Sequence, residues 1–199
     1  EPLISDALRI RRARFGPGHP DVAECVEALG LNFHDRGEYK QAEPNLRLAL
    51  AMRREMHPEG HPLLAQAMGN LAWALMDLEK YDEAEQLQRE SLVLKQRLYG
   101  DAHQENAAEL NNLAYTLQSK RDFAGAESFY RQALGMNIKL LGPDHPDVAF
   151  TENNLAWLLY RKGDLKGAVS LMRHVLGSRR RSLGAEHPDT LDTMGNLAN

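Results

Sequence analysis

A histidine recurs at a fixed interval along this chain. The five copies lie 42 residues apart, with no insertion between any two of them, at His19, His61, His103, His145 and His187. Such a period indicates one structural unit stacked on copies of itself. The sequence therefore predicts a single repeat array over residues 1–199. Its parts are a half repeat at 1–18, four full repeats at 19–60, 61–102, 103–144 and 145–186, and a half repeat at 187–199.

Each full unit carries two helical patterns. In the second unit Leu64, Met68, Leu71 and Leu75 fall on one face of a helix. A short break, "LEKYD", follows, and then a second helical segment, "DEAEQLQRESLVLKQRLYG". No segment shows the alternating pattern of a strand. We therefore expect an all-α fold of helix pairs stacked as a solenoid.

The sequence around the histidine, "LGPDHPDVA" in the fourth full unit, is best explained by helix initiation. Pro146 suits the first turn of a helix, where its missing N–H costs nothing. Asp147 suits the same turn, where negative charge is favoured. Because equivalent histidines should lie a whole repeat apart, they are not expected to form a metal or catalytic cluster.

Composition narrows the function. The 199 residues carry a net charge of −4, which argues against a general nucleic-acid binder. The single cysteine, Cys25, allows no internal disulfide and suits a reducing compartment, so we expect the cytoplasm. No apolar run approaches the length needed to span a membrane. No phosphate loop, zinc-spaced Cys/His set or nucleophile elbow is present, so we expect neither an enzyme nor a cofactor.

Several repeated segments resemble a known family. The segments are "LNNLAYTL" from Leu110, "NNLAWLLY" from Asn153, "GEYKQAEPNLRLAL" from Gly37 and "LGPDHPDVA" from Leu141. They resemble tetratricopeptide repeats of the kinesin light chain class, and the resemblance covers essentially the whole chain. It implies a right-handed superhelix of antiparallel helix pairs, with a concave face lined mainly by the first helix of each pair.

An asparagine column runs along the predicted first helices. It consists of Asn70, Asn112, Asn154 and Asn196, with Asn111 and Asn153 beside it. Asparagine is a mediocre helix former, so its recurrence needs a reason. Its amide both donates and accepts, and could therefore hold the backbone of an extended peptide. The resemblance implies the same role. The alternative is that these amides bond the neighbouring helix and make the stack rigid.

Aromatic residues share the next position of the same stripe, at Trp73, Tyr115 and Trp157. They could form pockets for apolar anchors of a bound segment. The alternative is that they pack between successive first helices.

A basic column recurs on the predicted second helices, at Arg11, Arg53, Lys95 and Arg179, with Asn137 at the fourth position. The resemblance places this column on the inner rim, where acidic residues of a bound segment would contact it. The alternative is a solvated face paired with nearby glutamates such as Glu55 or Glu90.

The leading hypothesis is a non-enzymatic scaffold that binds an extended or short helical peptide segment of a partner protein. Such a segment would carry acidic residues and an apolar anchor. The alternative is a sensor or docking arm of a larger signalling ATPase or protease whose active domain lies outside this sequence.

The two half repeats predict a fragment of a longer protein and head-to-tail self-association. The apolar residues expected to be exposed at the two ends are Leu8, Ile10, Leu191, Met194 and Leu197.

Overall fold

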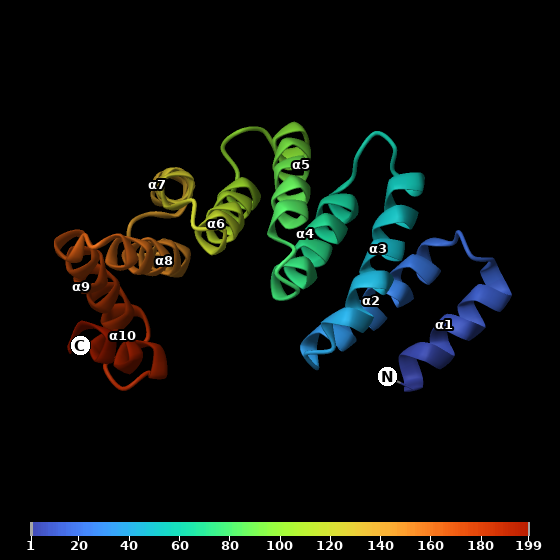
Figure 1. The fold of residues 1–199 in the computed structure, drawn as a ribbon, viewed down its shortest axis with the longest axis horizontal. Helices are drawn as coiled ribbons and strands as arrows, with labels where there is room; N and C mark the ends of the chain where they lie inside the picture. Colours follow the sequence, from blue (N-terminus) through green and yellow to red (C-terminus); the bar gives the residue numbers. More distant parts are fainter. Residues whose placement is uncertain (1, 199) are drawn as a thin grey trace. The chain divides into compact units, whose positions relative to one another are not determined.

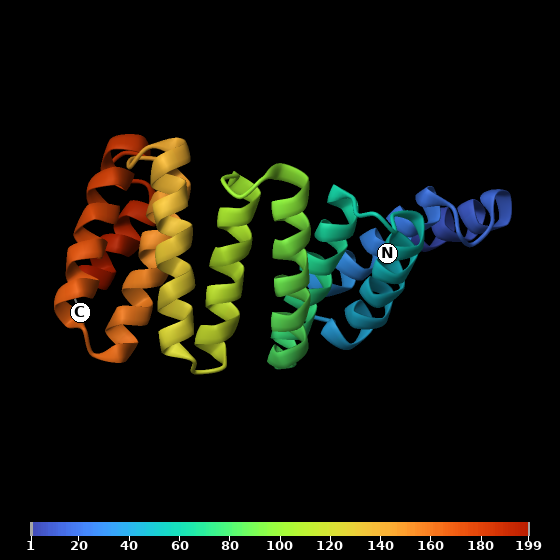
Figure 2. The same ribbon diagram turned by 90° about the horizontal axis from the view of Figure 1, so that it is seen from above.

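A computed structural model describes residues 2–198 of the chain, which form ten helices and no strand. The chain divides into two compact units, residues 1–98 and 99–199. Figure 1 shows the helices of each unit in chain order, and Figure 2 shows successive helices of a unit running antiparallel. The all-α helix-pair architecture predicted from the repeat is confirmed.

The first unit holds α1 (Pro2–Phe15), α2 (Pro20–Asp35), α3 (Tyr39–Met56), α4 (Pro62–Asp77) and all but the last residue of α5 (Tyr81–Tyr99). The second unit holds α6 (Gln104–Ser119), α7 (Phe123–Leu141), α8 (Pro146–Lys162), α9 (Leu165–Ser182) and α10 (Pro188–Ala198). The even-numbered helices are the first helices of the pairs, and each begins directly after one of the five recurring histidines.

The recurring histidines cap these helices. In every copy the imidazole Nδ1 accepts a hydrogen bond from the backbone N–H two residues later, at 3.2 Å. An accepting side chain at this position satisfies one of the N–H groups that a helix start leaves unbonded. The structural role predicted for the histidines is therefore confirmed.

In three of the five copies, the imidazole ring of the capping histidine stacks on the ring of the residue four positions earlier. These are Phe15 on His19, His57 on His61 and Tyr99 on His103. The turn between them needs a positive φ, as at Gly100 (+80°), a conformation that glycine adopts without steric cost.

Each unit has its own apolar core between the helix pairs. In the first unit Leu64, Met68, Leu71 and Leu75 of α4 are all buried, as the periodicity predicts. In the second unit Tyr130 of α7 is fully buried among alanines and leucines of α6, α8 and α9. Alanines at the helix crossings are also buried, which leaves room for close packing.

Polar contacts tie the second helices of the first unit together. Arg47 of α3 donates to Glu83 of α5, with Arg47 Nη2 at 2.7 Å from Glu83 Oε2, and also bonds Glu43. Burial raises the pKa of Glu43, but hydrogen bonds from Lys80 and Arg47 outweigh it and hold that pKa below its usual value. This cluster joins α3 to the helix pair that follows.

The end helices present apolar side chains to their surroundings. Ile10, Leu191 and Met194 are exposed, while Leu8 and Leu197 are half-buried. Leu8 packs against the core of the first unit. Head-to-tail association through these residues stays a prediction.

Candidate functional site

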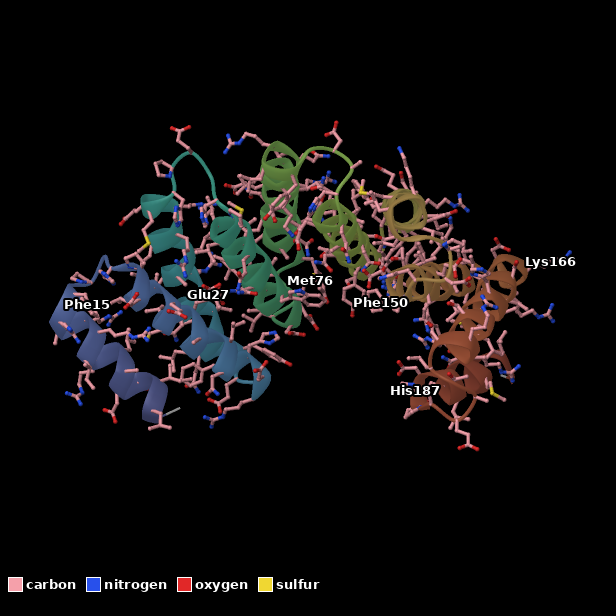
Figure 3. All side chains as sticks on the ribbon, turned by 180° about the vertical axis from the view of Figure 1, so that it is seen from behind. Phe15, Glu27, Met76, Phe150, Lys166 and His187 are labelled. Atoms are coloured by element: carbon pink, nitrogen blue, oxygen red, sulfur yellow. The ribbon has the colours of Figure 1, made fainter. Side chains whose placement is uncertain are left out.

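In the first unit, two of the predicted site residues meet at a third residue, Glu27 of α2. Asn70 Nδ2 of α4 donates to Glu27 Oε1 at 2.8 Å, and Arg53 Nη2 of α3 donates to Glu27 Oε2 at 3.5 Å. Glu27 is 6% exposed and Arg53 is 5% exposed. Figure 3 labels Glu27 on its helix. Arg53 is therefore not on an exposed rim; its guanidinium serves an ion pair between α2 and α3.

In the second unit, two asparagines bond each other. Asn154 Nδ2 of α8 donates to Asn111 Oδ1 of α6 at 3.2 Å, and Asn111 is buried. This bond and the one from Asn70 to Glu27 each join residues 43 apart in sequence. One period plus one residue is thus the offset at which neighbouring first helices touch. Both bonds agree with the interpretation that these amides stiffen the stack.

The remaining asparagines of the column are placed differently. Asn112 and Asn153 are half-buried, and within residues 2–198 their side chains form no hydrogen bond. Asn112 also lines one of the hollows described below, so its amide is placed where another molecule can bind.

The side chains of the three aromatic residues are exposed to nearly the same extent. Trp73 is 43% exposed, Tyr115 42% and Trp157 41%. Each follows an asparagine of the column by three residues, so the two lie on the same face of their helix. Trp157 also meets Tyr160 edge-on, with ring centroids 5.8 Å apart. A side chain that is two-fifths exposed can still cover an apolar group of a bound segment.

The other basic residues of the column contact the next first helix. Arg11 Nη1 donates to the carbonyl of Asp21 at 3.1 Å and to Glu24 at 3.4 Å. Arg179 Nη1 donates to the carbonyl of Asp189 at 2.9 Å and to Thr193 Oγ1 at 2.8 Å. Lys95 is half-buried on α5. Arg11 and Arg179 thus each fasten a second helix to the first helix after it, whereas Arg53 pairs with the helix before its own.

Two hollows flank α8 in the second unit. The first, of about 340 Å³, lies between α6, α7 and α8 and is lined by Asn111, Asn112, Asn137 and Phe150 among others. The second, of about 280 Å³, lies between α8, α9 and the start of α10 and is lined by Phe150 and Arg179 among others. Phe150, labelled in Figure 3, is 54% exposed and borders both.

Asn137 and Phe150 are residues that sequence reasoning did not assign to the site. The signal for Asn137 was its place in an otherwise basic column. The signal for Phe150 was an aromatic residue where the neighbouring repeats have Gln66 and Ala108.

A third hollow, of about 260 Å³, lies at the other end of α8. It is lined by Trp157 and Tyr160 of α8, Leu165 of α9 and Asn196 of α10, together with neighbouring apolar residues. Trp157 therefore opens onto a different hollow from Asn112 and Phe150.

One buried carboxylate lies beside the asparagine column. Glu152 of α8 is buried, and its Oε2 lies 2.7 Å from Nδ1 of His174 on α9. Burial raises the pKa of Glu152, and the contact with His174 only partly offsets this effect. The pair joins α8 to α9 and does not line any of the three hollows.

Neither a metal centre nor a membrane span emerges from the described part of the chain. Among residues 2–198, no three His, Cys, Asp or Glu side chains gather closely enough to hold a metal ion. None of the ten described helices is both long and apolar enough to cross a bilayer. Cys25 is buried and free, as expected for a packed thiol.

Comparison with known proteins agrees with the architecture. Models of the tetratricopeptide repeat match residues 1–55 and 106–181, and a further model of the same repeat matches residues 64–105. No curated protein matches the sequence significantly.

Solved structures share the fold. A Podosopora anserina kinesin light chain-like protein with nearly identical TPR-like repeats superposes with a TM-score of 0.82 at 19% identity, covering 91% of this chain and 85% of that one. BtubC (BKLC) from P. vanneervenii gives a TM-score of 0.77 at 26% identity, covering 98% and 77%. The apo form of RapI gives 0.75 at 14% identity, covering 96% and 73%.

Proposed function

Because the chain belongs to the tetratricopeptide repeat family, we propose that it is a protein–protein interaction scaffold whose first helices bind a peptide segment of a partner protein. The segment is extended or forms a short helix. The free, buried thiol of Cys25 suits a cytoplasmic setting. The protein needs no catalytic group for this role, because the binding itself is the function.

The observation that carries the proposal is the face of α6 and α8 in the second unit. Asn112 lines a hollow of about 340 Å³, has a half-exposed amide, and is followed one turn later by the two-fifths exposed ring of Tyr115. A free amide can bond a peptide backbone without reading its sequence, and an exposed ring can cover an apolar anchor. Phe150 supplies an aromatic surface in the lining of the hollow itself.

The test uses a random peptide library displayed on phage, followed by fluorescence anisotropy with a selected peptide. Asn112→Ala removes one amide without breaking a side-chain hydrogen bond to any residue in 2–198. Losing a hydrogen bond at a desolvated site costs about 1–3 kcal/mol, so affinity should fall roughly fivefold to a hundredfold. The matched control is Gln132→Ala on α7, whose amide bonds only within its own helix.

The control should keep the wild-type affinity within about twofold. Circular dichroism should show unchanged helical content in both variants. A folded Asn112→Ala protein that binds as tightly as the wild type would remove this face as the binding site and direct attention to the hinge loops.

A further inference from the structure

The two hollows beside α8 are the same hollow in consecutive repeats. Their lining residues correspond at the 42-residue period, as three pairs illustrate: Glu105 with Asp147, Ala108 with Phe150, and Asn137 with Arg179. Because Asp147 and Phe150 line both, the two hollows are adjacent. We refer to them as the Asn137 hollow and the Arg179 hollow. A segment that crosses α8 would contact both in succession.

The Asn137 hollow contains a buried acceptor without a partner. Asn137 is 4% exposed, and its Nδ2 lies 3.3 Å from Thr151 Oγ1. Its Oδ1 is buried and accepts no hydrogen bond from any residue in the described part of the chain. Buried polar atoms are nearly always bonded, so each exception calls for an explanation. A donor on a bound segment would supply the missing partner.

The charge around this acceptor is negative. Glu105 and Asp147 line the Asn137 hollow, and no Lys or Arg is among the described residues that line it. Asp147 Oδ2 already accepts a hydrogen bond from Gln104 Nε2 at 2.7 Å. A neutral donor would satisfy Asn137, but only a cation would also gain from the two carboxylates. The lining therefore favours a positively charged donor.

The walls fit the stem of such a donor. Lys and Arg pack the methylene part of their side chains on apolar surface while the charged end reaches polar groups. Phe150 is more than half exposed at the edge of the hollow, and Ala108 lies in its wall. An aromatic face also attracts a cation directly.

The Arg179 hollow is also lined by two carboxylates, Asp147 and Asp189, but unlike the Asn137 hollow it contains a cation, Arg179. Both of the hydrogen bonds that Arg179 forms with the described residues come from Nη1, so its Nη2 can donate to an acceptor on a ligand. A guanidinium matches a carboxylate well because its two N–H groups fit two oxygens.

We propose that the bound segment places a Lys or Arg side chain in the Asn137 hollow and an acidic side chain in the Arg179 hollow. The inference rests on the proposed peptide binding and adds its charge pattern. The basic column predicts that the array prefers acidic residues in the bound segment, and the Asn137 hollow would reverse this preference in one repeat. A single departure from that column, Asn137, thereby fixes the register and direction in which the segment lies across α8.

The test uses an array of short synthetic peptides in an Ala-Gly-Ser background. Each carries one Trp or Leu, and Lys, Arg, Gln, Asp or Glu is placed in turn at every other position. The full 199-residue chain is the reagent, compared with Asn137→Arg, Asn137→Asp and Arg179→Asn. Asn137→Asp keeps the size of the side chain and serves if Asn137→Arg fails to fold.

The wild type should prefer Lys or Arg over Glu about tenfold at one position and Glu or Asp over Lys at another. Asn137→Arg should reverse the first preference, Asn137→Asp should increase it, and Arg179→Asn should abolish or reverse the second. Thermal melts followed by circular dichroism confirm folding.

The outcomes separate the two proposals. Peptide binding that Asn112→Ala weakens, but that shows no basic preference or one unchanged by both Asn137 variants, overturns this inference and leaves the proposed function standing. Absence of binding to any peptide of the array overturns both.

Discussion

Replacing Glu27 by alanine should destabilise the first unit more than any exposed substitution. The carboxylate is buried between α2, α3 and α4, where it accepts bonds from Arg53 and Asn70. Its loss leaves the Arg53 guanidinium buried with no counter-charge, and Arg53 Nε already has no hydrogen-bond partner among the described residues. Removing one member of a buried ion pair costs about 3–5 kcal/mol. The contact at 3.5 Å is long, so we expect the lower end, about 3 kcal/mol.

A double substitution should recover most of that loss. Buried pairs replaced by apolar residues of similar volume are often neutral or more stable. Glu27→Met with Arg53→Met should therefore lie within about 1–2 kcal/mol of the wild type, the remainder reflecting the lost acceptor of Asn70. The matched control is Glu24→Ala, because Glu24 pairs with Arg11 at a similar distance of 3.4 Å but is exposed. Exposed pairs contribute about 0–1 kcal/mol.

Hydrogen exchange followed by mass spectrometry is the suitable assay, because it measures opening of α2 to α4 separately from the rest. The second unit serves as the internal reference. For a unit of this size, a loss of about 3 kcal/mol also lowers the melting temperature by roughly 12 °C or more. A cost below about 1 kcal/mol for Glu27→Ala, or a double variant no more stable than the single one, would refute the reasoning. Arg53 would then be available to a ligand.

Two further predictions concern the ends of helices. Asp164→Ala removes the side chain that accepts a backbone N–H at the start of α9, and thermal melts should show a loss of about 1 kcal/mol; an unchanged melt would contradict the capping role. Burial and the positive charge of His61 and Arg53 lower the pKa of His57 below 6.5, so the unfolded chain binds more protons there and stability falls as pH drops below that value. His57→Tyr, which copies Tyr99 of the next repeat, should abolish this loss. Urea titrations at pH about 8 and about 5 should show that the stability of the variant, relative to the wild type, rises at the lower pH. A difference that is the same at both pH values would count against the prediction.

The helices were predictable from sequence because their determinants are local. Apolar spacing, a proline at the first turn and glycine beyond the last turn each depend on a few neighbouring residues, and the proline and the glycine each occur in four of the five copies. The structural role of the recurring histidines was predictable, but the hydrogen bond by which each one caps its helix was not. Imidazole is not among the usual capping residues, and only the coordinates show Nδ1 of His145 aimed at the N–H of Asp147.

The site was predictable only in part. The repeat position of a residue shows which face of its helix it lies on, but not which side chain of the neighbouring helix it contacts. Arg53 and Arg179 share a position in the repeat, yet Arg53 is buried because a carboxylate, Glu27, stands opposite it. The position that Glu27 occupies in its repeat holds Gly69 and Asn111 in the next two repeats. The offset of 43 residues that links Asn154 to Asn111 likewise follows from how neighbouring first helices pack, which the period alone does not specify.

In a stack of repeated units, the positions that all units share cannot by themselves determine where a ligand begins or in which direction it lies. A segment bound only through the asparagine column would fit equally well if shifted by one repeat. Departures from the repeat remove that degeneracy. Asn137 of α7, in place of a cation, and Phe150 of α8, in place of a small or polar residue, occur once each. Because both line the same hollow, a segment shifted by one repeat would lose the contacts of both together. The specificity of the array should therefore concentrate at the hollow between α6, α7 and α8, which both of these residues line.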